Sequence, residues 1–175
     1  MPLRAFEYDG TVLGWSKLIT ADDKYVYKYS FNKNKWSDYE EGVELLKEFD
    51  PDLFVDMYCT DTYLCYVTNK IDHIDRYSLR GVIHYKKIVQ SHLTLYKHFG
   101  SFVAKKDMNP SNILHRKSDH KQYFIDWDGV SRFKNNDDCY KFYRDELCSH
   151  WWQQAYKLTK QGLQKTFDME WEKLQ

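Results

Sequence analysis

The 175-residue sequence has no excess of charge of either sign and no long apolar run. Its 26 Lys and Arg residues balance 26 Asp and Glu residues, so the net charge gives no reason to expect attraction to nucleic acid or to a membrane surface. No apolar run approaches the ~18 residues of a membrane span, and the start, MPLRAFEYDG, lacks the pattern of a secretory signal. We therefore expect a cytoplasmic protein with no membrane span and no nucleic-acid partner.

The four cysteines form no C-x-x-C pair and no tight cluster with histidine. They are Cys59, Cys65, Cys139 and Cys148. This spacing favours reduced thiols over a disulfide framework or a zinc site. The seven histidines are scattered as well, and His115 and His120, which flank a polar turn, are predicted to be solvated rather than metal-binding.

Glycine is scarce, with seven residues, whereas aromatic residues make up 18% of the chain. A hydrophobic content of 42% argues against wholesale disorder. The core is therefore expected to consist of a few large side chains. The length fits one domain or two small lobes that share an interface.

The hydrophobic pattern predicts strands in the first part of the chain and helices in the later part. Short strands are expected within residues 5–30, with turns at Asp9-Gly10 and 21–23, and as a pair within residues 53–71 around a turn at 60–62. Helices are expected over residues 37–49, 81–100, 137–159 and 163–174. This order indicates an α+β fold with a small N-terminal antiparallel sheet plus one helix, followed by a helical C-terminal part.

Local patterns also predict orientations within the N-terminal part. Alternation in KYVYKYS places three tyrosines on one face of a strand and Lys28 on the other. Ser37 or Asp38 is expected to cap the start of helix 37–49, and Asp50-Pro51 to end it.

Residues 107–129, DMNPSNILHRKSDHKQYFIDWDG, combine two aspartates and an asparagine with a predicted β-hairpin. The start of the first strand of a hairpin lies beside the end of the second, so Asn112 and Asp126 should come together. Asp107 should join them from the preceding loop. Carboxylate and amide oxygens suit a hard cation such as Mg²⁺, and a further carboxylate can accept a proton from a hydroxyl group. The alternative is an ordinary hairpin in which these residues cap turns and end a strand.

This stretch resembles the protein-kinase-like superfamily. DMNPSNIL matches the catalytic loop, an Asp followed after four residues by Asn, and FIDWDG stands where the metal-binding D-F-G segment would lie. The proline in the loop and the IDWD sequence are closest to the aminoglycoside phosphotransferase, choline kinase and lipopolysaccharide kinase branches. The resemblance covers roughly residues 10–130.

The resemblance implies a two-lobed kinase-like fold in a compact form. An N-lobe would span residues 1–70 and a reduced helical C-lobe residues 71–175, the latter with the catalytic loop at 105–112 and the metal-binding segment at 124–129. ATP and Mg²⁺ would be the cofactors, with ATP between the lobes.

The same resemblance implies a role for each of Asp107, Asn112 and Asp126. Asp107 would be the catalytic base that deprotonates an acceptor hydroxyl, and Asn112 and Asp126 would hold Mg²⁺. Asp128 matches more loosely and could assist Asp126. A kinase or phosphotransferase that moves the γ-phosphate of ATP to a hydroxyl group is therefore expected.

The N-lobe of the family carries a lysine that pairs with nucleotide phosphates and with a helix glutamate. Lys28 is on the strand directly before helix 37–49, where that lysine belongs. Glu41 is the expected partner, with Glu40 and Glu44 as rivals. The alternatives are a solvated strand lysine and a solvated helix face.

Two further nucleotide contacts are implied in the N-lobe. The segment DGTVLGWSK contains Gly14 and Ser16, whose backbone N–H groups could reach phosphate, but it lacks the full G-x-G-x-x-G set. Residues 67–73, which include Asn69, resemble the hinge whose backbone would meet the adenine. A plain connector is the alternative for this hinge segment.

Several features depart from the family pattern. Lys106 precedes the catalytic aspartate, with Lys105 before it, where His-Gly or His-Arg would be usual. Lys106 could mimic the charge of that arginine, hold the transferring phosphate or be a solvated loop lysine. Only 46 residues follow Gly129, fewer than in most family members.

These departures leave a second function open, a nucleotide-binding pseudokinase that acts as a regulatory or partner-binding module. The phosphate acceptor is not specified by the sequence and could be a small molecule, a sugar or a protein hydroxyl. Trp151 and Trp152 are expected to fill the core of the C-terminal part, with a protein-partner surface on the aromatic C-terminal helices as the alternative.

Overall fold

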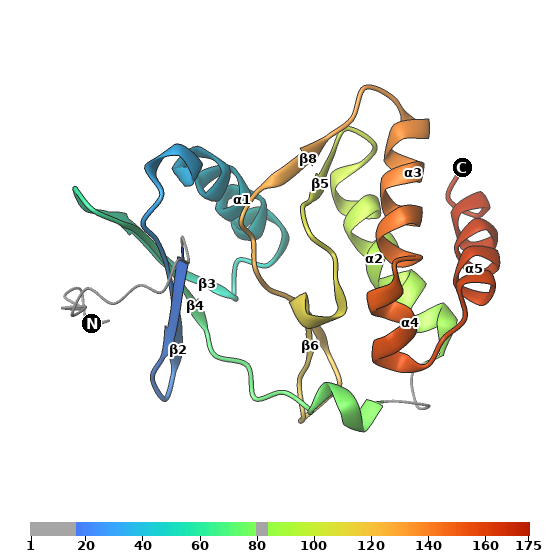
Figure 1. Cartoon of the computed structure of the whole chain (residues 1–175), viewed down its shortest axis with the longest axis horizontal. Coiled ribbons are helices and arrows are strands. Elements are labelled where there is room, and N and C mark those ends of the chain that lie inside the picture. The colour runs from blue at the N-terminus through green and yellow to red at the C-terminus, as the bar shows by residue number, and fades with distance from the viewer. Residues whose placement is uncertain (1–16, 80–83) are drawn as a thin grey trace. The chain divides into compact units, whose positions relative to one another are not determined.

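The computed structural model describes residues 17–79 and 84–175, and the chain divides into two compact units, Met1–Lys70 and Ile71–Gln175. The first unit is built on an antiparallel sheet and one long helix, and the second contains the other helices and two short strand pairs (Figure 1). The mixed α+β composition predicted from the hydrophobic pattern is therefore confirmed. The expected Asp9-Gly10 turn lies outside the described residues.

The sheet of the first unit has four antiparallel strands in the order β1-β2-β4-β3. They are β1 (Lys17–Ala21), β2 (Tyr25–Ser30), β3 (Phe54–Cys59) and β4 (Leu64–Asn69). Asp22 closes the first turn, because its Oδ1 accepts hydrogen bonds from the N–H groups of Lys24 (2.8 Å) and Tyr25 (2.7 Å). Thr60 closes the second, where its Oγ1 accepts from the N–H of Tyr63 at 3.1 Å. Both turns lie where the sequence predicts them.

The helix α1 (Trp36–Phe49) packs on one face of this sheet. Tyr39 and Val43 on the helix contact Leu64 and Tyr66 on β4, and all four side chains are buried. These residues repeat at helical spacing on α1 and at alternate positions on β4, which brings the two apolar faces together. The helix ends at Phe49, before Asp50, as predicted.

The start of α1 differs from the prediction, because neither Ser37 nor Asp38 is its N-cap. A short 3₁₀ turn, η1 (Lys33–Lys35), leads directly into the helix. The indole N–H of Trp36 donates to the carbonyl of Ser30 at 3.1 Å and so ties the first helical residue to the end of β2. The helix therefore starts one residue early, and Ser37 and Asp38 lie within its first turn.

The second unit begins with η2 (Arg76–Leu79) and the long helix α2 (Tyr85–Phe99). Four short strands and a 3₁₀ turn follow, and three helices complete the unit. They are β5 (Val103–Lys105), η3 (Pro110–Asn112), β6 (Ile113–His115), β7 (Gln122–Phe124), β8 (Val130–Arg132), α3 (Asn136–Leu147), α4 (His150–Tyr156) and α5 (Lys160–Glu172). β5 pairs with β8 and β6 with β7, both antiparallel.

The helix α2 lies within the predicted range 81–100 and ends where the sequence predicts. It ends at Gly100, whose φ of 74° is readily adopted by glycine. Near its start, α2 packs against α5: the Tyr85 ring lies so close to Gly162 that a Cβ there would be 2.5 Å from the ring. The Tyr85 hydroxyl accepts a hydrogen bond from the N–H of Thr159 at 3.1 Å, which holds the start of α5 to α2.

The predicted helix 137–159 is wrong in one respect, because it is two helices. The chain leaves the helical conformation at Ser149, and the side-chain amide of Gln153 donates to the carbonyl of Cys148 at 3.2 Å. Both adjacent tryptophans lie on α4, after the break. Trp152 is 2% exposed and fills the core, whereas Trp151 is 56% exposed, which corrects the expectation that both are buried.

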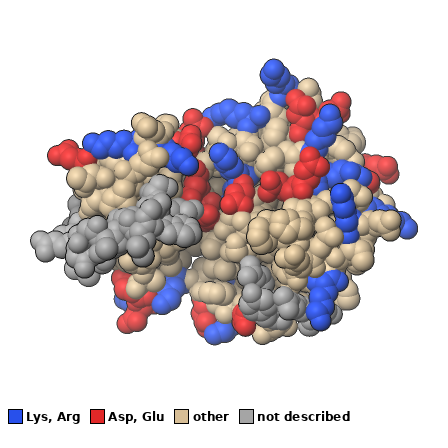
Figure 2. Space-filling model, in the orientation of Figure 1, with Lys and Arg blue, Asp and Glu red and all other residues tan. Residues whose placement is uncertain are grey.

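On the face shown in Figure 2, lysines and arginines are interspersed with aspartates and glutamates over the described residues. None of the helices within residues 17–79 and 84–175 has the length and hydropathy needed to cross a membrane.

Candidate functional site

The β6–β7 hairpin brings the predicted metal-binding residues together. Ile113 pairs with Phe124 in its register, and the N–H of Ile125 donates to the carbonyl of Asn112 at 2.9 Å. Asn112 therefore lies beside Asp126, although the two residues are far apart in sequence. This is the arrangement that an antiparallel hairpin predicts for residues at its open end.

Asp107 is attached to the same hairpin through Asn112. The side-chain Nδ2 of Asn112 donates to the backbone carbonyl of Asp107 at 3.1 Å, and Asn112 is 7% exposed. The Asp107 carboxylate is exposed, and its Oδ1 accepts a hydrogen bond from Nδ2 of Asn109 at 2.7 Å. Asn109 in turn accepts from the N–H of Ser111 at 2.9 Å at the start of η3. The carboxylate is thus oriented by a chain of side-chain hydrogen bonds.

Both aspartates have left-handed backbones, with φ of 56° at Asp107 and 63° at Asp126. For a residue with a Cβ this conformation costs on the order of 1 kcal/mol or more, so the surrounding contacts must compensate for it. The described residues contain only two other non-glycine residues of this kind, His120 and Lys157.

The donor set of the site fits a hard cation. Nδ2 of Asn112 is bonded to the Asp107 carbonyl, so Oδ1 of Asn112 is turned away from that carbonyl. An amide oxygen and the nearby Asp126 carboxylate are ligands of the type that Mg²⁺ takes, together with water and phosphate oxygens. Within residues 17–79 and 84–175, no three His, Cys, Asp or Glu side chains gather in a group that could hold a metal ion, so an ion at this site would rest on Asp126, the Asn112 amide and ligands from outside the protein.

Three side chains that the sequence analysis did not select hold the backbone of the Asp107 loop. Nζ of Lys105 donates to the carbonyls of Lys106 (3.0 Å) and Asp107 (3.1 Å). Glu146 of α3 accepts from the N–H of Met108 at 3.0 Å, and the Trp152 indole donates to the Met108 carbonyl at 3.2 Å. No sequence motif marked these contacts, because Glu146 and Trp152 are about forty residues from the loop.

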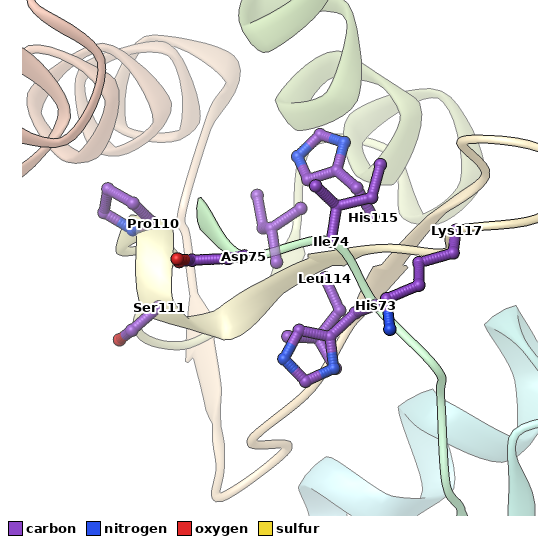
Figure 3. Close-up of a pocket in the computed structure, with 9 residues that line it drawn as sticks. His73, Ile74, Asp75, Pro110, Ser111, Leu114, His115 and Lys117 are labelled. Atoms are coloured by element: carbon purple, nitrogen blue, oxygen red, sulfur yellow. The ribbon is translucent and has the colours of Figure 1, made fainter. Parts of the chain in front are cut away.

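A concave pocket of about 510 Å³ adjoins the same loop. Figure 3 shows that its lining comes from the segment before η2, from η3 and from β6. Ile74 and Leu114 supply apolar walls, and Asp75, Ser111 and Lys117 supply polar groups. The volume lies within the roughly 300–1,000 Å³ typical of small-molecule sites.

His115 also lines this pocket and corrects a sequence-based expectation. It is 4% exposed rather than solvated, because the β6 alternation turns it inward. Burial lowers the pKa of His115 to about 4, with a further contribution from the positive charge of Lys87. The side chain is therefore neutral at physiological pH.

A second buried histidine, His92 on α2, lies behind the loop. Its Nδ1 is 3.0 Å from the carbonyl of Ile88, and its ring meets Trp152 edge-on at 4.9 Å between centroids. Burial lowers the pKa of His92 to about 4. Both ring contacts are those of a neutral core histidine.

In the sheet unit, Lys28 is buried at 4% exposure on the face of β2 that α1 covers. Its Nζ lies 5.7 Å from the centroid of the Tyr66 ring on β4. Tyr27 and Tyr29 lie in a cluster on the opposite face, so the predicted alternation of β2 is confirmed.

The glutamates proposed to pair with Lys28 are all on α1. Glu40, Glu41 and Glu44 have exposed side chains, and Glu44 pairs with Lys47 at 2.6 Å. Which of them binds Lys28 stays a prediction.

The remaining predicted site residues are Gly14, Ser16, Asn69 and Lys106. Gly14 and Ser16 lie outside the described residues. Asn69, at the end of β4, is exposed, and its side-chain amide donates to the carbonyl of Asp52 at 2.7 Å. Lys106 is exposed, and its backbone N–H donates to the carbonyl of Gly129 at 3.2 Å. Their roles in binding or catalysis stay predictions.

The chain is similar in fold to solved structures of WbdD. One is described as a medium-resolution structure of the bifunctional kinase-methyltransferase WbdD, with a TM-score of 0.53 and 13% identity, covering 94% of this chain and 45% of that chain. A crystal structure of monomeric WbdD has a TM-score of 0.54 and 12% identity, covering 87% of this chain and 44% of that chain. A co-crystal structure of WbdD with the kinase inhibitor LY294002 has a TM-score of 0.51 and 12% identity, covering 90% of this chain and 44% of that chain.

No protein-family model matches the sequence, and no curated protein matches it. The chain spans less than half the length of the WbdD chains, and at 12–13% identity the likeness is one of fold alone. This fold likeness is consistent with the kinase-like fold that the residues of the Asp107 loop suggest.

Proposed function

We propose that the protein is a small ATP-dependent kinase or phosphotransferase that uses Mg²⁺. The observation that supports this most is the hydrogen-bonded connection of Asp107, Asn112 and the residue preceding Asp126. The bond to Asp107 is made by the Asn112 side chain and needs a side-chain donor at this position, whereas the bond from Ile125 is made by the Asn112 backbone carbonyl. The fold likeness to a kinase-containing enzyme points the same way.

The pocket beside the loop suggests where the nucleoside part of ATP binds. Ile74 and Leu114 offer apolar surface for a base, and Asp75 and Ser111 offer groups for ribose hydroxyls. Because Ser111 belongs to η3, which ends at Asn112, a nucleotide in this pocket would have its phosphates near the proposed metal ligands.

The proposed reaction is an in-line transfer of the γ-phosphoryl group. The acceptor hydroxyl gives its proton to the Asp107 carboxylate, its oxygen forms the new O–P bond, and the bond from the γ-phosphorus to the bridging oxygen breaks to release ADP. Asn112 and Asp126 would hold Mg²⁺, which neutralises phosphate charge when bound. Asn109 orients the Asp107 carboxylate, and Lys28, with a glutamate of α1, would contact the phosphates.

The test is the substitution Asp126→Ala, assayed with γ-labelled ATP and a panel of sugar, amino-alcohol and protein hydroxyl acceptors. We expect Mg²⁺-dependent turnover to fall at least about 1,000-fold, because the phosphate charge is no longer neutralised. Asp119→Ala is the matched control, since Asp119 lies in the turn of the same hairpin and pairs only with groups of that turn, including Arg116. Turnover equal to wild type in Asp126→Ala would overturn the assignment.

The second candidate function is a nucleotide-binding pseudokinase. It predicts a rise in melting temperature with ATP and Mg²⁺ that is lost in EDTA, but no labelled product with any acceptor. The exposed Asp107 carboxylate, already oriented by Asn109, favours the enzyme over this alternative.

A further inference from the structure

Lys105 is buried completely, with 0% exposure, at the end of β5. Its strand pairs with β8, and Lys105 itself is opposite Val130 in that pairing. A lysine ammonium removed from water is strongly unfavourable unless it is bonded, so a buried lysine marks a place where the charge has a partner or a role.

The Lys105 ammonium group forms hydrogen bonds with the backbone of the Asp107 loop. It donates to two consecutive carbonyls, those of Lys106 and Asp107, and lies 5.6 Å from the centroid of the Trp127 ring. Trp127 is itself fixed, at 1% exposure, by an indole hydrogen bond of 2.7 Å to the carbonyl of Phe124. Lys105 thus connects the loop that carries Asp107 to the segment that follows Asp126.

The Asp107 carbonyl receives two donors, Nζ of Lys105 and Nδ2 of Asn112. A carbonyl oxygen has two lone pairs, so both are used. The other side of this same peptide group, the N–H of Met108, donates to Glu146, and the carbonyl of the next peptide group, that of Met108, accepts from Trp152. Three successive peptide groups, from Lys106 to Met108, are therefore fixed by side chains around the left-handed Asp107.

We propose that Lys105 is a positioning residue that acts through Asp107. It has no contact with the reacting atoms in this assignment. Its cation instead holds the two carbonyls that flank the strained residue, so that the Asp107 carboxylate stays in the direction set by Asn109. The proposal rests on the proposed function for its effect on turnover, whereas its effect on loop order does not.

The main variant is Lys105→Met, which keeps the length of the side chain and removes the charge and the donors. We expect kcat to fall by about 10- to 100-fold while KM for ATP changes less than about twofold, because a displaced base affects the transition state more than nucleotide binding. Lys105→Arg, which keeps the donors, should recover most of the loss. Lys121→Met is the matched control, because Lys121 is an exposed lysine 4.7 Å from the Tyr123 ring centroid with no role in the loop.

Hydrogen exchange supplies the readout that does not depend on turnover. In Lys105→Met we expect faster exchange of the Lys106 and Met108 amides and unchanged exchange in α2 and α5. If the methionine variant does not fold, Lys105→Gln, which keeps N–H donors on a shorter neutral side chain, is used and should show a smaller change in the same direction.

The outcomes separate the two proposals. Local loosening of the loop with a lower kcat supports the positioning role. Unchanged loop exchange, or faster exchange throughout the helical unit, overturns it. If the wild-type protein transfers no phosphate but loop exchange still rises locally in Lys105→Met, the proposed function fails and the positioning of Asp107 by Lys105 stands.

Discussion

The sheet unit and the helical unit each bury one lysine against an aromatic ring. Lys28 of the sheet unit is 4% exposed and lies 5.7 Å from the Tyr66 ring centroid, and Lys105 of the helical unit is 0% exposed and lies 5.6 Å from that of Trp127. Their backbones differ. Lys28 is in the middle of a regular strand between two paired neighbours, whereas Lys105 ends a three-residue strand and donates to the irregular loop after it.

The difference indicates two uses of a buried cation. A lysine on a strand has its own backbone satisfied by the sheet, so its ammonium is the group that can meet a ligand such as phosphate. Loop carbonyls have no paired strand whose N–H groups could donate to them. A lysine beside a loop can therefore supply the hydrogen bonds that these carbonyls need. We therefore propose substrate contact for Lys28, as the family resemblance implies, and loop order for Lys105.

The largest effect expected from this comparison is that of Lys28→Met. We predict a loss of at least about 1,000-fold in kcat/KM, equal to ~4 kcal/mol of transition-state stabilisation, with a raised KM for ATP. Lys105→Met should instead leave KM for ATP nearly unchanged. Steady-state kinetics over a range of ATP concentrations distinguish the two. Lys24→Met, an exposed lysine in the β1–β2 turn, is the control. The same KM shift in both buried-lysine variants would contradict the separation of roles.

The next effect concerns the tryptophans, since each unit has an indole that donates to a backbone carbonyl. Trp152→Ala should lower the free energy of unfolding of the helical unit by about 4 kcal/mol, because a core side chain and the bond to Met108 are lost. Trp36→Ala, where the indole binds Ser30 and is half-buried, should cost about 2 kcal/mol. Trp151→Ala is the exposed control and should cost less than about 0.5 kcal/mol. Urea unfolding of each variant measures these values.

The last comparison concerns acid sensitivity, which should differ between the two units. All seven histidines lie within residues 71–175, and the pKa values of His92 and His115 are lowered from 6.5 to about 4. Between these values the unfolded chain binds more protons than the folded one. The stability of the helical unit is therefore full above about pH 6.5 and is lost as the pH falls toward 4, by up to about 3 kcal/mol per histidine.

Urea titrations at pH 7 and pH 4.5, followed by NMR of the indole N–H signals, measure this loss unit by unit. The Trp152 signal reports on the helical unit and the Trp36 signal on the sheet unit. His92→Gln should reduce the pH dependence, and His84→Gln, an exposed histidine, should not change it. Equal acid loss at Trp36 and Trp152 would show that the units unfold as one.

Regular elements were predicted where one local rule was sufficient. The alternation in β2, the turns at Asp22 and Thr60, and the end of α2 at Gly100 each depend on residues within a few positions of one another. The hairpin that joins Asn112 to Asp126 was predicted for the same reason, since its strands are separated by one short turn.

Other features were wrong because contacts that the local patterns do not mark decide them. Trp36 is tied to Ser30, which moves the start of α1. The predicted helix 137–159 breaks at Ser149, and on α4 only Trp152 of the two tryptophans faces the core. His115 was expected in solvent, but the pairing of β6 with β7 turns it inward.

The sequence by itself determined the α+β composition and the close approach of Asn112 to Asp126, because strand alternation and hairpin pairing act over short distances. Only the tertiary structure decided how the Asp107 loop is held. Lys105 is placed beside the loop carbonyls because β5 pairs with β8. Glu146 and Trp152 contact Met108 because α3 and α4 fold back onto the loop. A buried charge and its partners are selected by the whole packed unit, and no local pattern carries that information.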